Sequence, residues 1–152
     1  MKQKIFLGAD HAGFKLKEEI KKLLEALGYT YVDLGVYNDK NYSDYPETAF
    51  KVAQKVANHN GKGILMCGTG IGEVIVANKV KGIRAANCFN EYTARMSREH
   101  NNSNVLCLGA RVLNKNLAKK IAKIWLETGF SNETRHRRRV KQIANIEKNL
   151  YN

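Results

Sequence analysis

Gly63-Ile64-Leu65-Met66-Cys67-Gly68-Thr69-Gly70-Ile71-Gly72 is the stretch that most strongly predicts the fold. Its apolar first half is typical of a buried strand, and its alternating glycines predict a tight loop. A helix is expected to begin near Ile71 and to reach about Lys79. Glycine amides that converge at a helix N-terminus suit an anion, and Cys67 adds a candidate nucleophile or proton acceptor. A buried cysteine in an ordinary strand–helix turn explains the pattern equally well.

Short apolar runs alternate with helical patterns along the rest of the chain. Helix boundaries are signalled by Gly28, Pro46, Asn90 and Asn114. Strands are expected at residues 5–8, 31–34, 64–67, 83–88 and 105–108. This alternation predicts an α/β fold, a Rossmann-like three-layer αβα sandwich around a five-stranded, mainly parallel sheet. A last helix is expected near the C-terminus. One of its sides carries Val140, Ile143, Ile146 or Glu147, and Leu150. This helix is expected either to pack on the same domain or to extend toward a partner subunit.

The composition, with 43% hydrophobic and 26% charged residues, is that of an ordinary globular protein. The length of 152 residues fits one domain, residues 1–152, and no repeat or linker divides it. The chain begins directly with a strand pattern and has no apolar run of bilayer length, so we expect a cytoplasmic location. Three cysteines without ligand spacing argue against disulfides and zinc. Cys88 and Cys107 are expected in the core, whereas Cys67 has a loop context that exposes it.

The formal net charge of +12 is concentrated near the C-terminus. Residues 111–152 hold 11 Lys and Arg against 3 Glu, and the densest cluster is Arg135-His136-Arg137-Arg138-Arg139. Nucleic-acid binding is one interpretation of such a cluster. An arginine-lined site for a phosphorylated small molecule is a second, and a solvated helix face is a third.

Ligands of parallel α/β sheets bind beyond the carboxyl ends of the strands. The polar residues that follow strands here are Asp10 and His11, the segment from Cys67 to Gly72, and Arg111. We therefore expect these residues at one edge of the sheet. His100 precedes a strand, so the same rule places it away from that edge in its own subunit.

A set of short motifs occurs in order along nearly the whole chain: Asp10-His11-Ala12-Gly13-Phe14, Asp44-Tyr45-Pro46, Cys67 to Gly72, Ala77-Asn78-Lys79, Gly82-Ile83-Arg84-Ala85, Ser97-Arg98-Glu99-His100-Asn101, and Arg135-His136 with Arg139. This set resembles the type B ribose-5-phosphate isomerases. The resemblance implies an aldose–ketose isomerase of the pentose phosphate pathway that works through a cis-enediolate without metal or organic cofactor. It also implies homodimers or tetramers whose active sites are shared, so that His100 completes the site of a neighbouring subunit.

The resemblance also implies roles for individual residues. His100 is the acid that opens the sugar ring, with Asp10 and His11 binding nearby, and Cys67 is the base that moves a proton between C2 and C1. The loop of Gly68, Thr69, Gly70, Ile71 and Gly72 binds the substrate and stabilises the enediolate through its amides. Thr69 is also expected to be a catalytic residue. Arg135 and Arg139 are expected to bind the phosphate, and Arg111 and Asn101 are expected to make further contacts to it. Arg137 and Arg138 are expected in solvent, and His136 in a structural role.

Glu73 departs from the usual family pattern, which has an apolar residue at this position followed by serine. A subset of the family has glutamate here, lacks the cysteine and uses the carboxylate as base, whereas this chain has both groups. Cys67 is the favoured base, with Glu73 tuning it; Glu73 as the base, or as a helix N-terminal charge, are the alternatives.

Three other functions compete with this reading. An allose or galactose 6-phosphate isomerase of the same superfamily is the nearest. A basic RNA-binding domain lacks the aromatic-interleaved strand that such domains use. A dinucleotide-binding module lacks a glycine loop after the first strand and the later acidic residue. We expect a sugar phosphate as ligand, with no nucleic acid or membrane partner.

Overall fold

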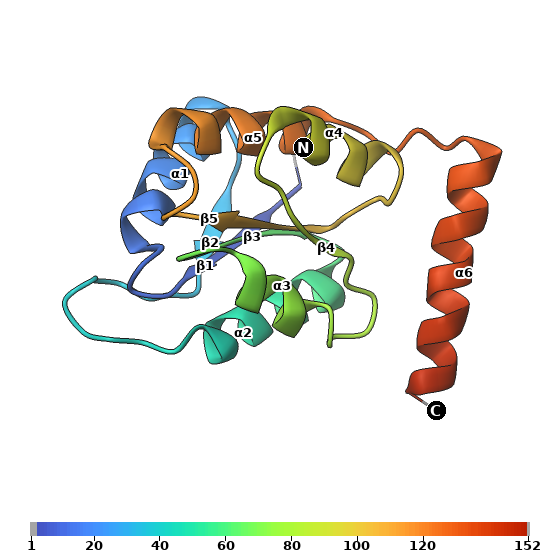
Figure 1. The fold of residues 1–152 in the computed structure, drawn as a ribbon, viewed down its shortest axis with the longest axis horizontal. Helices are drawn as coiled ribbons and strands as arrows, with labels where there is room; N and C mark the ends of the chain where they lie inside the picture. Colours follow the sequence, from blue (N-terminus) through green and yellow to red (C-terminus); the bar gives the residue numbers. More distant parts are fainter. Residues whose placement is uncertain (1–2, 152) are drawn as a thin grey trace.

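A parallel five-stranded sheet forms the centre of the computed structural model, which describes residues 3–151 (Figure 1). Its order is β2-β1-β3-β5-β4, and each neighbouring pair is parallel. The predicted α/β fold and its five strands are thereby confirmed. Met1, Lys2 and Asn152 of the predicted domain lie outside the described residues. The strands are β1 (Ile5–Ala9), β2 (Tyr31–Asp33), β3 (Lys62–Cys67), β4 (Ala85–Asn87) and β5 (Val105–Gly109).

Six helices occur in the described part of the chain, and sequence signals explain several of their ends. The side chains of Asn90 and Asn114 accept hydrogen bonds from the backbone at the starts of α4 and α5, and Pro46 lies in the first turn of α2. The helix after the glycine loop ends at Ala77, two residues earlier than expected. The helices are α1 (Phe14–Ala26), α2 (Tyr45–His59), α3 (Ile71–Ala77), α4 (Glu91–Glu99), α5 (Lys115–Glu127) and α6 (Thr134–Leu150).

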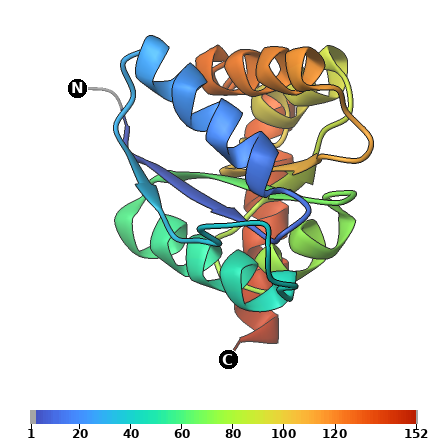
Figure 2. The ribbon, with the colours of Figure 1, turned by 90° about the vertical axis from the view of Figure 1, so that its left-hand side faces the viewer.

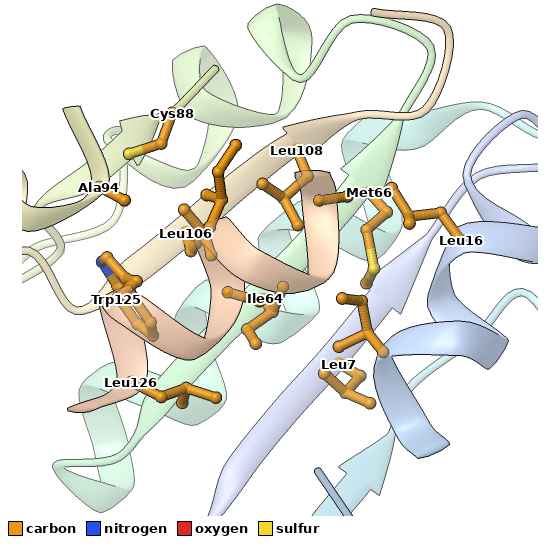
Figure 3. Close-up of a cluster of buried hydrophobic side chains, with 14 of the residues drawn as sticks. Leu7, Leu16, Ile64, Met66, Cys88, Ala94, Leu106, Leu108, Trp125 and Leu126 are labelled. Carbon is orange, nitrogen blue, oxygen red and sulfur yellow. The ribbon is translucent and has the colours of Figure 1, made fainter. Parts of the chain in front are cut away.

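Helices cover both faces of the sheet, as the two views of the ribbon show (Figures 1 and 2). Helices α1, α4 and α5 lie on one face, and α2 and α3 lie on the other. Successive strand residues alternate between the two cores, so Ile64 and Met66 pack on the first face while Leu65 packs on the second. Figure 3 shows the first core, in which the indole of Trp125 is fully buried and donates to Ser103 Oγ at 2.8 Å.

Helix α6 stands apart from these layers, beside the edge strand β4 (Figure 1). Its apolar side chains remain well exposed, among them Ile146 at 61% and Leu150 at 74%. Near its C-terminal end, Glu147 accepts a hydrogen bond from the Gly82 amide at 2.8 Å, and the Tyr151 hydroxyl donates to the Lys79 carbonyl. The apolar stripe predicted from the sequence thus lines an open groove against β4 rather than a closed core.

None of the helices between residues 3 and 151 combines the length and the apolar character needed to cross a bilayer.

Candidate active site

The loop after β3 wraps closely around the end of the strand. Gly70 has a φ of +81°, a conformation that favours glycine, and its amide donates to Cys67 Sγ at 3.1 Å. The Cys67 carbonyl accepts from the Ala110 amide at 2.8 Å, which ties this loop to the residues after β5. A methyl group at Gly72 would lie 2.3 Å from the ring of Tyr45, so this ring packs directly on the first turn of α3.

The Cys67 thiol is buried, with the residue only 4% exposed, so the expectation that its loop context exposes it is wrong for the single chain. Burial, followed by the nearby charge of Glu73, raises the pKa of the thiol to about 11. The amides of Gly70 and Thr69 act in the opposite direction but do not outweigh these effects. The helix N-terminus therefore does not by itself favour a thiolate in the isolated subunit.

Glu73 lies on the buried face of α3, beside Cys67. The residue has no exposed surface, and neither carboxyl oxygen has a hydrogen-bond partner among residues 3–151. Burial, with the neighbouring charge of Asp10 second, raises the pKa of this carboxyl well above its ordinary value of 4.5. Ionising a buried carboxyl without a hydrogen-bond partner costs folding free energy, and this makes Glu73, beside Cys67, a candidate functional group of the site.

Replacing Glu73 with glutamine is expected to stabilise the folded protein, increasingly so as the pH rises. The raised pKa means that the folded state holds this proton more tightly than the unfolded state. The wild-type free energy of unfolding therefore falls, relative to Glu73→Gln, as the pH rises above about 4.5 toward the folded-state pKa. Denaturant unfolding of both proteins between pH 5 and 8 measures the difference. Asp10, Cys67 and Cys107 lie near residue 73 in both proteins, so the comparison isolates the titration of Glu73 itself. A difference in the free energy of unfolding that does not change with pH would contradict the burial of a protonated carboxyl.

Asp10 and His11 follow β1 at the same edge of the sheet. The Asp10 carboxylate accepts from the Gly13 amide at 2.9 Å, and its charge reaches Glu73 and Cys67. The ring of His11 is held by the loop before α2: its Nδ1 lies 3.1 Å from the Ser43 carbonyl oxygen, and its ring centroid lies 4.4 Å from that of Tyr42.

A buried lysine anchors the beginning of that loop. Lys17 has no exposed side-chain surface, and its ammonium donates to Asp33 at 2.6 Å and to the Val36 carbonyl. Val36 in turn pairs through its amide with Ala9, the residue before Asp10, at 2.8 Å. The loop therefore braces the chain on both sides of Asp10.

Arg111 follows β5 and completes this edge. Its amide donates to the Gly68 carbonyl at 2.9 Å, and its guanidinium lies directly beside Gly68. The structure thus brings Asp10, His11, the loop with Cys67 and Arg111 to one edge of the sheet, as expected from their positions after strands, and Glu73 of α3 joins them. We call this set the carboxyl-edge group.

The remaining predicted residues lie at the other end of the sheet. His100 is the C-cap of α4, and the loop that follows it returns to the start of β3, where the Gly63 amide donates to the Asn104 carbonyl at 2.9 Å. Cys67 ends the same strand, four residues after Gly63 and so roughly 13 Å further along at about 3.3 Å per residue. Within one chain the two parts of the predicted site are therefore separated. The second set, which we call the helix-end group, comprises His100, Asn101, Arg135 and Arg139.

Arg135 and Arg139 are exposed on α6 and lie one turn apart, on the same side of the helix. Arg135 pairs with the exposed Glu133 at 2.9 Å, and the guanidinium of Arg139 faces solvent. Two arginines at this spacing suit a phosphate that approaches from outside the subunit. Arg137 and Arg138 are also exposed, as expected for solvated residues.

Several contacts at the site have no clear signal in the sequence. Ser43 and Tyr42 hold His11 from a segment that reads as a polar loop, and Lys17 looks like one of many helix lysines. Asn87 donates to the Thr69 carbonyl at 3.3 Å. Asn87 ends β4, so the rule that selected Asp10 and Arg111 applies to it as well.

Comparison with known proteins identifies close relatives. The model of the ribose/galactose isomerase family matches residues 5–143. The chain is 44% identical to ribose-5-phosphate isomerase B of Escherichia coli, over 95% of this chain and 97% of that protein. The structure of ribose-5-phosphate isomerase B from Clostridium thermocellum superposes with a TM-score of 0.93 at 47% identity, covering 97% of this chain and 99% of that one. The enzyme from Mycoplasma genitalium, solved with bound ribulose-5-phosphate, superposes with a TM-score of 0.89 at 44% identity, covering 95% and 96%.

Proposed function

The chain belongs to the ribose/galactose isomerase family, and on this premise we propose that it is a ribose-5-phosphate isomerase. It interconverts the aldose ribose 5-phosphate and the ketose ribulose 5-phosphate, a step of the pentose phosphate pathway. The observation that carries the proposal is the carboxyl-edge group, which places two proton-exchanging side chains, Cys67 and Glu73, beside a loop of backbone amides and the guanidinium of Arg111.

The active site is built by two subunits in this proposal. The carboxyl-edge group of one subunit receives the helix-end group of its partner, which explains why the two sets lie apart in one chain. The exposed arginines of α6 and the open apolar groove beside it support this arrangement. A homodimer is the minimum assembly, and dimers can pair further into tetramers. Each subunit contributes residues 1–152 as one domain, located in the cytoplasm, where its free cysteines stay reduced.

The reaction begins with ring opening, because ribose 5-phosphate is mostly a closed furanose. His100 donates a proton to the ring oxygen as the bond between this oxygen and C1 breaks, and the anomeric hydroxyl loses its proton to water. Asp10 and His11 bind the sugar hydroxyls near the anomeric carbon. An imidazole suits this step because its ordinary pKa lies near neutrality. The product of this step is the open-chain aldehyde.

Proton transfer between carbons follows. Cys67 removes the proton from C2 and returns it to C1 through a cis-enediolate, whose oxygen is stabilised by the amides of the loop Gly68–Gly72 and by Thr69. With a pKa of about 11, the thiol is protonated at neutral pH in the single chain, so the thiolate must form in the assembled, substrate-bound site. Glu73 tunes this thiol, and its carboxylate is the alternative base.

Replacing Arg135 or Arg139 with alanine is expected to raise KM for ribose 5-phosphate by about 10- to 100-fold, because each removes a charge-assisted contact to the phosphate. Arg137→Ala and Arg138→Ala are the matched controls from the same helix and should change KM less than about twofold. Steady-state kinetics of the four variants make the comparison. Equal effects at all four positions would favour a diffuse basic surface over a phosphate site.

The function itself is tested by assaying the purified protein, after EDTA treatment, against ribose 5-phosphate and the 6-phosphates of allose and galactose. The proposal expects the highest kcat/KM with ribose 5-phosphate and undiminished activity after chelation. A preference for a hexose phosphate would move the chain to the alternative activity of the same family. Activity abolished by chelation and restored by a divalent ion would overturn the cofactor-free mechanism.

A further inference from the structure

His100 does not stand alone at the end of α4. Its imidazole packs against that of His136 in a tilted arrangement, with ring centroids 4.1 Å apart and ring planes at 37°. His136 belongs to the first turns of α6, and it is the one residue of that helix that is buried in the described chain, at 2% exposure. The side chain that faces the proposed ring-opening acid is therefore enclosed by protein, while its neighbours Arg135 and Arg137 face solvent.

A short network holds His136 in place. The Ser131 hydroxyl lies 2.7 Å from His136 Nδ1, and the Ser131 amide donates to the carbonyl of Glu99, the residue before His100, at 3.1 Å. The His136 amide donates to the Glu133 carbonyl at 2.9 Å. Ser131 thus links the C-terminal end of α4 to the beginning of α6, with the two imidazoles in contact between them.

We propose that His136 is a positioning residue for His100: its buried ring, fixed by Ser131, sets the orientation in which the His100 imidazole meets the sugar ring of the substrate. This inference rests on the proposed function, because it concerns the ring-opening step alone. His136 touches no reacting atom and acts through His100.

The electrostatics of the two histidines agree with His100 as the proton donor and His136 as its support. Desolvation, followed by the proximity of His100, lowers the pKa of His136, and Arg135 and Arg139 act in the same direction while Glu133 opposes them. The neutral form of His136 is therefore favoured beside His100. An imidazole with free side-chain torsions would spend much of its time misdirected, and a displacement of about 1 Å can cost on the order of a hundredfold in rate.

The chemistry of the two substrates separates ring opening from proton transfer. Ribose 5-phosphate closes a furanose through its C4 hydroxyl and must be opened. In ribulose 5-phosphate the hydroxyl needed to close a five-membered ring on C2 carries the phosphate, so this ketose is open-chain. Solvent-deuterium exchange at C1 of ribulose 5-phosphate therefore reports the Cys67 or Glu73 step without ring opening.

The test compares His136→Leu, His136→Phe and the control Arg137→Ala in both reactions. His136→Leu fills the volume without a planar ring, so kcat for ribose 5-phosphate should fall about tenfold while KM and C1 exchange in ribulose 5-phosphate stay within about twofold. His136→Phe keeps a planar ring against His100 and should recover most of the lost kcat. Arg137→Ala should match the wild type in every measurement.

Other outcomes would overturn the inference. Equal loss of ribose turnover and of C1 exchange would mean a general disturbance of the site, and a raised KM with unchanged kcat would mean that His136 serves the phosphate arginines. Unchanged kinetics with a lower melting temperature would leave His136 a purely structural role. If His136→Leu does not fold, Ser131→Ala must show a smaller but equally selective fall in kcat for ribose 5-phosphate, with C1 exchange in ribulose 5-phosphate unchanged. A wild type inactive on ribose 5-phosphate refutes the proposed function, whereas an active wild type whose variants lack this selectivity refutes only the positioning role.

Discussion

Cys67→Ala is expected to lose nearly all turnover, by about a thousandfold or more, while it still binds ribose 5-phosphate. In the proposed mechanism Cys67 moves the proton between C2 and C1, whereas other residues make the phosphate and hydroxyl contacts. Glu73→Gln is the matched comparison, because it keeps the shape and a hydrogen-bonding group. It should slow the reaction only about tenfold.

Solvent-deuterium incorporation into the sugar phosphate decides between the two groups, with binding measured separately by calorimetry. If Glu73 is the base, the ranking reverses: Glu73→Gln loses exchange and Cys67→Ala retains it. Two observations favour this alternative: the Glu73 carboxyl is buried without a hydrogen-bond partner among the described residues, and the pKa of the Cys67 thiol is raised. Robust exchange by Cys67→Ala would transfer the catalytic role to Glu73.

Mixing inactive His100→Ala with inactive Cys67→Ala protein should restore about one quarter of the wild-type activity. In a two-fold symmetric dimer, random exchange makes half of the dimers hybrid, and each hybrid has one site with both Cys67 and His100 and one site with neither. The measurement is isomerase activity after partial unfolding and reassembly at equal concentrations. Native mass spectrometry, with one variant isotopically labelled, confirms that hybrids form. Hybrids without activity would place both residues in the site of a single subunit.

The parts of the site that follow from the sequence are those with local signals. Cys67 and the loop to Gly72 are encoded by a strand, a glycine alternation and a helix start within ten residues. Asp10 and Arg111 follow from the rule that places ligands beyond parallel strands. The separation of His100 from Cys67 is likewise visible, because His100 precedes its strand.

What the sequence could not show depends on contacts between distant segments. The burial of Glu73 arises because α3 turns this residue toward the sheet, so the structure does not support the alternative of a simple helix N-terminal charge. The support of His11 by Ser43 and of His100 by His136 joins segments whose spacing carries no periodic signal. Lys17 has the composition of a surface residue but lies under a loop that only the fold brings over it.

The position of α6 has a consequence for how this enzyme can diversify. The sheet and both of its helical layers are complete by Glu127, and α6 adds little to either core. Substitutions at the exposed positions of this helix, Arg135 and Arg139 among them, therefore carry a small folding penalty within one subunit, whereas His136 is buried. Under the proposed function, selection can thus adjust how far the two arginines reach toward the phosphate, and so the length of sugar that fits, without disturbing the sheet and its helical layers.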